Sequence, residues 1–249
     1  MDVVTLVDEL PRAERVLVGL PGIGRVGHVA AAYLINKSNA TPVAQFTSPY
    51  FPPQVVVEHG ILRLLSNTLY YVDSEEPYFV LTGDTQVVGS APSEFYEYVL
   101  DFLEFFKGLG VKEIYTMAGI DRGPARWSGS PGVVVAATEK EILDRFVELG
   151  AKVDESGAIS GAAGLLLGLG AQQGYRGACL MGETSTQLTM HGDPGAAFAV
   201  LSLLDKYMPL GVDLSELEDA AHKFDEILHR MTAPPEQEPK PPEPSDYIR

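Results

Sequence analysis

Three glycines between an apolar run and a helical segment form the first candidate site. Gly22, Gly24 and Gly27 follow the apolar residues 16–20 with the spacing G-x-G-x-x-G. In dinucleotide-binding domains these glycines let the backbone approach a pyrophosphate, and an acidic residue about 20 positions later binds the ribose. Here the next expected strand, residues 42–48, contains no carboxylate, and a proline lies within the turn. The other interpretation is that the glycines let the helix pack closely on the strand.

A second group of polar residues follows the apolar run 177–182. It contains Glu183, Ser185, His191 and Asp193. Sites in α/β proteins form beyond the carboxyl ends of strands, so these residues could serve a phosphorylase-like enzyme, a hydrolase or a nucleoside-binding protein. No third ligand is spaced for zinc, and no G-x-S-x-G sequence is present. Asp193 is explained equally well as the N-cap of the next helix.

Two further groups have a structural interpretation beside a functional one. The loop from Asp121 to Trp127 follows a predicted strand and could line a pocket or a protein interface, or lie on the surface with its ring packed on the body. His222 and His229 lie seven residues apart on a predicted helix with carboxylates at helical spacing, a pattern that favours a solvated face over a metal patch. We therefore predict no catalytic, cofactor-binding or metal-binding residue.

The overall composition restricts the class of partner. The chain has 249 residues and a net charge of −16, so it would repel a phosphate backbone, and nucleic acid is not an expected partner. No apolar run is long enough to span a membrane, and no basic n-region opens the chain. The single cysteine, Cys179, lies in an apolar stretch. We expect a cytoplasmic protein without membrane association.

Alternating strands and helices predict a three-layer α/β/α sandwich with a mixed sheet. The predicted strands are residues 3–7, 15–20, 42–46, 78–82, 113–118, 132–137 and 177–182. The predicted helices are residues 24–36, 94–107, 140–149, 160–173, 194–207 and 214–231. Ser93 and Asp193 are the expected N-caps of the second and fifth helices. Three short runs at 54–58, 61–65 and 69–72 predict a small β-hairpin or meander inserted beside the main sheet. Four glycines in 160–173 indicate close packing of that helix against another element.

The composition changes after Met231. Residues 1–231 predict one α/β/α domain, whereas residues 232–249 contain six prolines and predict an extended, flexible tail. About seventeen residues at ~3.1 Å each reach roughly 50 Å. The sequence ends in Tyr247, Ile248 and Arg249. An aromatic and an aliphatic side chain before a terminal carboxylate are typical of a tethered peptide that a partner captures, and a tail without a role fits the same composition.

The glycine segment resembles the signature of the proteasome assembly chaperone family, in particular its archaeal members. The resemblance is carried by GLPGIGRVG at residues 19–27 and AAAYLI at residues 30–35, and more weakly by GYRGACLMGET at residues 174–184. It implies a phosphorylase-like fold without phosphorylase activity, homo-oligomers and binding to proteasome α subunits. Some members dock through a C-terminal hydrophobic–tyrosine–any motif. Here Asp246 precedes the tyrosine and two residues follow it, so the motif is matched only in part.

These observations predict a non-enzymatic assembly chaperone or adaptor that oligomerises and presents its tail to a partner such as the proteasome α ring. Tyr247, Ile248 and Arg249 are the predicted partner-binding residues. The alternative is a phosphorylase-like enzyme, or a nucleotide- or nucleoside-binding protein, that uses the loop from Gly22 to Gly27 and the cluster from Glu183 to Asp193.

Overall fold

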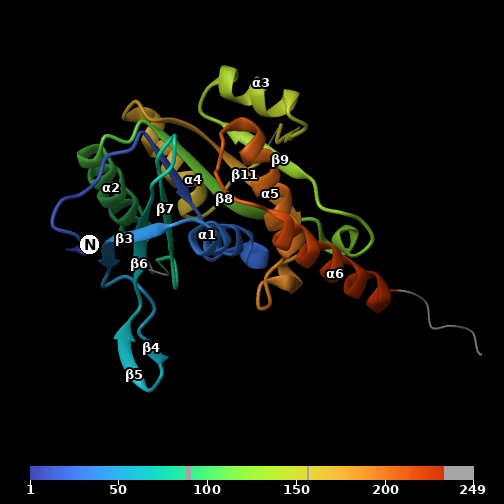
Figure 1. Ribbon diagram of the computed structural model, residues 1–249, viewed down its shortest axis with the longest axis horizontal. Helices are drawn as coiled ribbons and strands as arrows, with labels where there is room; N and C mark the ends of the chain where they lie inside the picture. Colours follow the sequence, from blue (N-terminus) through green and yellow to red (C-terminus); the bar gives the residue numbers. More distant parts are fainter. Residues whose placement is uncertain (88–90, 156, 233–249) are drawn as a thin grey trace, which may run out of the picture.

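A nine-stranded mixed sheet forms the middle of the computed structural model, which describes residues 1–87, 91–155 and 157–232 (Figure 1). Its strands are β1 (Asp2–Thr5), β2 (Arg15–Val18), β3 (Ala40–Thr47), β6 (Asn67–Val72), β7 (Tyr78–Gly83), β8 (Glu113–Asp121), β9 (Val133–Ala137), β10 (Lys152–Val153) and β11 (Arg176–Thr184). Their order across the sheet is β1-β3-β6-β7-β2-β8-β11-β9-β10. Two more strands of the described chain, β4 (Val55–Glu58) and β5 (Ile61–Leu64), form a separate hairpin.

Four neighbouring strands at the centre of the sheet, β7, β2, β8 and β11, run parallel. Their sequences are near-continuous apolar runs, as in residues 16–18, because both faces of the sheet are covered. Their carboxyl ends lie along one edge of the sheet, which we call the carboxyl edge; it is marked by Gly83, Val18, Asp121 and Thr184. Antiparallel strands β6, β3 and β1 extend the sheet on one side, and β9 pairs antiparallel with β11 on the other.

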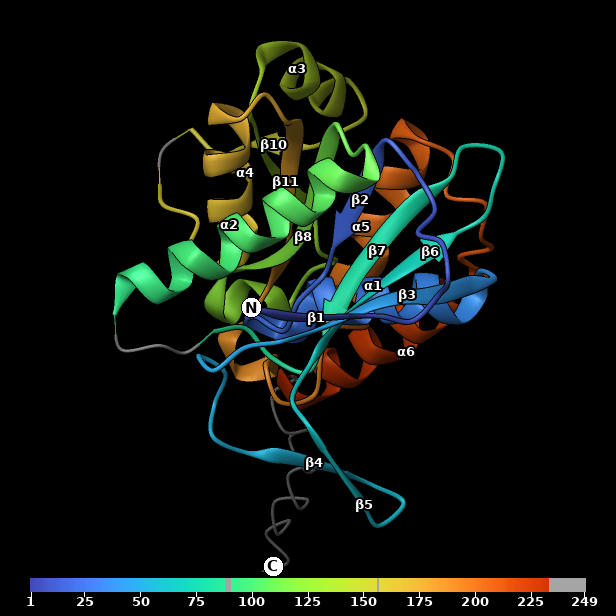
Figure 2. The ribbon, with the colours of Figure 1, turned by 90° about the vertical axis from the view of Figure 1, so that its left-hand side faces the viewer.

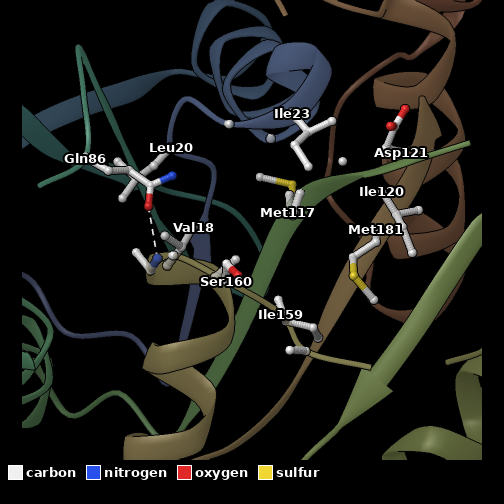
Figure 3. A pocket seen from close by; sticks show the side chains of 18 of the residues that line it. Val18, Leu20, Ile23, Gln86, Met117, Ile120, Asp121, Ile159, Ser160 and Met181 are labelled. Carbon is white, nitrogen blue, oxygen red and sulfur yellow. Dashed lines mark hydrogen bonds between the residues drawn. The ribbon is translucent and has the colours of Figure 1, made fainter. Parts of the chain in front are cut away.

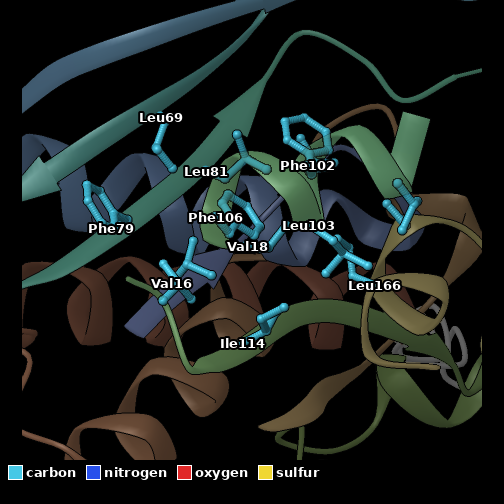
Figure 4. Packing of buried hydrophobic residues seen from close by; sticks show 14 of the residues in the cluster. Val16, Val18, Leu69, Phe79, Leu81, Phe102, Leu103, Phe106, Ile114 and Leu166 are labelled. Carbon is cyan, nitrogen blue, oxygen red and sulfur yellow. The ribbon is translucent and has the colours of Figure 1, made fainter. Parts of the chain in front are cut away.

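Helices cover both faces of this sheet and create two cores (Figures 1 and 2). One face carries α2 (Pro92–Leu109) and α4 (Ala162–Gln172); the other carries α1 (Val26–Lys37), α3 (Lys140–Glu148), α5 (Pro194–Tyr207) and α6 (Ser215–Thr232). Alternation along β2 serves both cores, since Val16 and Val18 contact the first and Leu17 the second. In the first core, Phe102 and Phe106 of α2 stack on each other (Figure 4). The predicted three-layer α/β/α sandwich is confirmed.

Most predicted elements are present within a few residues of their predicted ends. α5 begins at Pro194, and the Asp193 carboxylate accepts a hydrogen bond from the Ala196 N–H at 3.0 Å, as expected of an N-cap. The prediction that Ser93 caps α2 is wrong. That helix begins at Pro92, two residues before its predicted start at residue 94, because proline presets the helical φ and lacks the N–H that would otherwise be unpaired there.

The prediction for the three short runs is correct for two of them and wrong for the third. β4 and β5 pair antiparallel through His59 and Gly60, which both have positive φ, as a tight two-residue turn requires. The third run instead lies in the main sheet as β6, between β3 and β7. No sequence signal indicated β10, which has two residues and, among the described strands, pairs with β9 alone.

The glycines around α4 have different roles. The helix begins at Ala162 rather than at residue 160, and Gly161 precedes it with a φ of 81°. A Cβ at Gly164 would lie 2.2 Å from the Ile159 carbonyl oxygen, so close packing is the reason for this glycine. At Gly168 no heavy atom of the described residues, apart from the backbone of the same helix, lies within 4 Å of this position, so the packing prediction is wrong there.

Candidate functional site

The glycine loop at the end of β2 is shaped by contacts between backbones. A Cβ on Gly27 would lie 2.0 Å from the Met117 carbonyl oxygen in β8, and one on Gly19 would lie 2.1 Å from the Gly27 carbonyl oxygen. Gly24 has a φ of 58° and packs against the Thr184 side chain. These distances place the start of α1 directly on the sheet. Close packing therefore explains Gly24 and Gly27, whereas a Cβ on Gly22 would have its nearest neighbour, Gln86 Nε2, at 3.8 Å.

A cavity of about 330 Å³ lies beside this loop at the carboxyl edge (Figure 3). Its wall is formed by the ends of β2, β8 and β11, and by residues 158–163, which lead into α4. The lining is mostly apolar: Val18, Leu20, Ile23, Met117, Ile120, Ile159 and Met181. Its polar side chains are Gln86, Asp121, Asp154 and Ser160. No lysine, arginine or histidine is among the described residues that line it.

Gln86 links the glycine loop to the start of α4 by hydrogen bonds. Its Nε2 donates to the Pro21 carbonyl oxygen at 2.6 Å, and its Oε1 accepts from the Ala162 N–H at 2.9 Å (Figure 3). A helix N-terminus attracts anions because its first N–H groups have no partner within the helix. Here the amide oxygen of Gln86 already occupies one of them.

Asp121 also has a structural role at the cavity wall. One carboxylate oxygen, Oδ1, accepts hydrogen bonds from the N–H groups of Gly123 at 3.0 Å and Thr186 at 3.1 Å. These two backbone N–H groups lower the pKa of Asp121 below its ordinary value. A phosphate in the cavity would therefore meet an ionised carboxylate instead of a cation, which is unfavourable.

The cluster from Glu183 to Asp193 does not converge on one point. Glu183 accepts hydrogen bonds from Lys152 at 3.0 Å, Arg122 at 3.1 Å and the Gly132 N–H at 3.0 Å. Burial alone would raise the pKa of Glu183, but these donors lower it, so the group stays ionised. Asp193 belongs to a different network.

The other two residues of that cluster, Ser185 and His191, form no hydrogen bond with Glu183 or Asp193. Ser185 Oγ accepts from the Gln187 N–H at 3.3 Å and caps a 3₁₀ turn, Thr186–Leu188. The His191 side chain is exposed. Neither lies in hydrogen-bond contact with Glu183 or Asp193, so the described residues form no nucleophile–base pair here.

A buried ion pair at the carboxyl edge was not predicted from the sequence. Arg126, 3% exposed, lies in the short 3₁₀ helix η2 (Gly123–Trp127) and donates to both oxygens of Asp193, at 2.7 and 2.8 Å. Its Nη2 also donates to Asp225 of α6 at 2.7 Å. The loop residue predicted for a pocket or an interface thus joins η2, α5 and α6 inside the protein. A single arginine in a glycine- and proline-containing loop gives no periodic signal of burial.

Two projecting features share the carboxyl edge with this network. The β4–β5 hairpin leaves from the end of β3 and returns at the start of β6, where Asn67 pairs with Gly83 (Figures 1 and 2). α6 starts at the opposite edge, where Lys37 pairs with Glu216 at 2.6 Å, and it passes Arg126 before ending at Thr232. The predicted partner-binding residues, 247–249, lie outside the described residues.

The described ranges contain neither a metal-binding cluster nor a membrane-spanning helix. No group of three or more His, Cys, Asp or Glu side chains is arranged there to bind a metal ion. His222 is exposed, and its Nε2 lies 3.9 Å from Glu218 Oε1, one helical turn away, as on a solvated helix face. In those same ranges, no helix combines the length and apolarity that crossing a membrane requires.

Comparison with known proteins assigns this arrangement to a family. The model of the PAC2 family matches residues 16–232, which include the glycine loop, the cavity and the Arg126 network. The chain belongs to the PAC2 family. The resemblance to proteasome assembly chaperones, predicted from residues 19–35, is confirmed.

Individual known proteins are similar to most of the chain. Pyrococcus furiosus PbaB, described as an archaeal proteasome activator, is 33% identical with a TM-score of 0.82, over 93% of this chain and 98% of its own. P. furiosus PbaA, an archaeal homologue of proteasome-assembly chaperone, shares the fold at 24% identity and a TM-score of 0.72, over 92% and 91%. An uncharacterised protein of Methanocaldococcus jannaschii is 31% identical over 86% of this chain and 81% of its own.

Proposed function

We propose that this PAC2 protein works in the cytoplasm as a non-enzymatic chaperone or activator of the proteasome, forming homo-oligomers that present residues 232–249 to the α ring. The observation that carries this proposal is the match to PbaB, an archaeal proteasome activator, over nearly the full length of both chains. In this proposal residues 1–231 form one body, and Tyr247, Ile248 and Arg249 contact the α subunits.

The attachment of α6 to the body supports separate roles for the body and for residues 232–249. α6 is tied to the body by Arg126 and Asp225 at 2.7 Å, seven residues before the helix ends at Thr232. The described end of α6 is therefore held at the carboxyl edge. Several weak tails on one oligomer would bind a ring of subunits more tightly than one tail, because each binding event raises the local concentration of the next tail.

The chemistry of the cavity gives the enzymatic alternative little support. Its described lining offers two carboxylates, an amide, a hydroxyl and apolar groups but no lysine, arginine or histidine, whereas a phosphorylase site uses cations to bind phosphate. Glu183 and Asp193 are each held in separate ion networks. In the loop from Gly22 to Gly27, Gly24 and Gly27 are pressed against Thr184 and the Met117 carbonyl oxygen, so these two glycines have a packing role.

Truncation after Thr232 tests the role of the tail. We expect the truncated protein to keep its thermal unfolding midpoint and native mass but to lose capture by purified proteasome α rings. In the full chain, Tyr247→Ala should weaken capture, and Asp246→Ala serves as the matched control. Undiminished capture by the truncated protein would refute the proposal.

A thermal shift assay with nucleosides, phosphate and NAD tests the alternative. A ligand present at about 100 times its Kd stabilises the native state by about 2.7 kcal/mol. For a chain of this length that corresponds to a rise of roughly 5–11 °C in the unfolding midpoint. We expect no such rise, and a rise of that size would favour a metabolite-binding protein.

A further inference from the structure

The β4–β5 hairpin presents an apolar face that the described body does not cover. Strand register pairs Val55 with Leu64 and Val57 with Leu62, so these four side chains lie on the same face of the ribbon. Their exposed fractions are between 49% and 66%. The ribbon stands clear of the sheet in both views (Figures 1 and 2).

The opposite face of the hairpin anchors it to the body. Arg63 Nη2 donates to Glu58 at 2.6 Å and to Asp84 at 3.0 Å, and the same Asp84 carboxylate accepts from the Ser66 N–H at 2.9 Å. The base of the ribbon is thereby fixed beside the end of β7. These contacts also pair the charge of Arg63 on the anchored face. The face formed by residues 55, 57, 62 and 64 consists of valine and leucine side chains and carries no charge.

A two-stranded ribbon gains little stability alone, since it needs a third strand or a packed partner to bury its apolar side chains. Contiguous exposed apolar side chains on a protein surface mark an interaction site. The hairpin therefore has the properties of a docking element, and the question is which molecule covers it.

A groove at the base of the same hairpin supplies the complementary shape. It has a volume of about 640 Å³ and is lined mainly by uncharged residues, among them Phe51, Pro52 and Leu65. Val55 and Leu64 belong both to this groove and to the apolar face. The hairpin forms one wall of the groove and so cannot fold back to fill it.

We propose that the hairpin is a self-association element, and that its apolar face packs on the hairpin and groove of a second copy of this chain around a two-fold axis. Val57 and Leu62, near the tip of one hairpin, then face Val55 and Leu64 at the base of the other. In such an interface each contact occurs twice, and one surface is complementary to itself. This proposal deepens the homo-oligomer part of the proposed function and rests on it.

Charge favours a second copy as the occupant. Two chains that each carry −16 repel each other over most of their surfaces. The face formed by residues 55, 57, 62 and 64 is uncharged, and the cation beside it is already paired, so two copies meet there with little like-charge repulsion.

Chemical cross-linking tests the proximity of the two hairpins. The native cysteine, Cys179, is buried, and burial raises the pKa of its thiol to about 11. We therefore expect no reaction of Cys179 with maleimides in the folded protein. Packed sheets lie about 10 Å apart, a distance that a short bismaleimide spans. Val57→Cys should give at least about ten times more covalent dimer than Val147→Cys, a control on α3 with 41% exposure. Equal yields would overturn the proposal.

Native mass and proteasome capture separate this proposal from the function on which it rests. Leu62→Glu buries a carboxylate against the apolar base of the other hairpin, and this happens twice in the dimer; a tenfold loss per contact becomes about a hundredfold rise in the dimer Kd. We expect a fall in native mass for Leu62→Glu and none for Val147→Glu. A Leu62→Glu variant that keeps its mass but loses α-ring capture would assign the face to the proteasome and overturn self-association. If the mass falls while the unmodified protein captures no α ring, the interface stands and the proteasome function fails.

Discussion

Replacing Asp193 with asparagine tests how strongly the buried ion pair holds the carboxyl edge together. Asp193 has no exposed surface, and its two oxygens accept hydrogen bonds from Arg126 Nε and Nη2, Thr184 Oγ1 and the Ala196 N–H, at 2.7 to 3.0 Å. Asparagine has nearly the same volume and can still cap α5 through one oxygen. It removes the negative charge, however, and directs an N–H group toward the guanidinium.

The expected cost follows from what Arg126 loses. Removing one partner of a buried ion pair costs about 3–5 kcal/mol, because the remaining charge stays buried without compensation. Asp225 still accepts from Arg126 at 2.7 Å, so we expect the lower end, about 3 kcal/mol. For a chain of this length, this predicts an unfolding midpoint lower by about 6–12 °C.

Thermal and denaturant unfolding of two variants provide the measurement. Asp225→Asn is the matched control; it removes one hydrogen bond to the same guanidinium from a carboxylate that is 16% exposed, and should cost about 1–2 kcal/mol. Adding Arg126→Met to Asp193→Asn should recover part of the loss, because the buried guanidinium is then absent and the remaining carboxylate, Asp225, is 16% exposed and reaches solvent. A cost below about 1 kcal/mol for Asp193→Asn, or no recovery in the double variant, would refute this account of the network.

Three further outcomes are expected. Gly27→Ala should cost at least about 3 kcal/mol, because its Cβ meets a carbonyl oxygen of β8 at 2.0 Å, whereas Gly22→Ala, with its nearest neighbour at 3.8 Å, should change the free energy of unfolding by less than about 0.5 kcal/mol. Gly168→Ala should stabilise the protein by about 0.5–1 kcal/mol, since this exposed helical position has free space around it; a loss of stability would contradict that. Burial alone would raise the pKa of Asp84, but hydrogen bonds from Arg63 and a backbone N–H lower it. The stabilisation is thus complete above the unfolded pKa of about 3.9 and lost as pH falls toward the folded value, so Asp84→Asn should flatten the fall in stability between about pH 5 and pH 2, and an unchanged slope would argue against the pair.

The sequence predicted most of the scaffold because its signals are local. Continuous apolar runs marked the parallel strands, and a polar residue followed by proline marked the start of α5 at Asp193 and Pro194. A polar residue before a helical pattern also predicted Ser93 as the N-cap of α2, but the proline before it, Pro92, begins the helix. The two residues of β10 are strand only because β9 lies beside them.

The site was less predictable because its members are brought together by tertiary contacts. Glu183 and Asp193 are ten residues apart and were grouped for that reason, yet they serve different networks. Arg126 and Asp225 are 99 residues apart and meet inside the protein. The apolar character of residues 54–65 was visible as strand propensity, but nothing local showed that one face would remain exposed.

The two attachments of α6 fix more than its position. Near its start, Tyr33 Oη donates to the Asp213 carbonyl oxygen at 2.7 Å, and farther along, Asp225 is held by Arg126. A rod supported at two points has a set axis and a set rotation about it. Each residue added between Asp225 and Thr232 would advance the exit of the chain by about 1.5 Å and swing it by about 100°. The number of residues between Asp225 and the end of α6 therefore sets the direction in which the chain leaves the helix. An insertion in that stretch changes this direction, whereas an insertion after Thr232 leaves it unchanged.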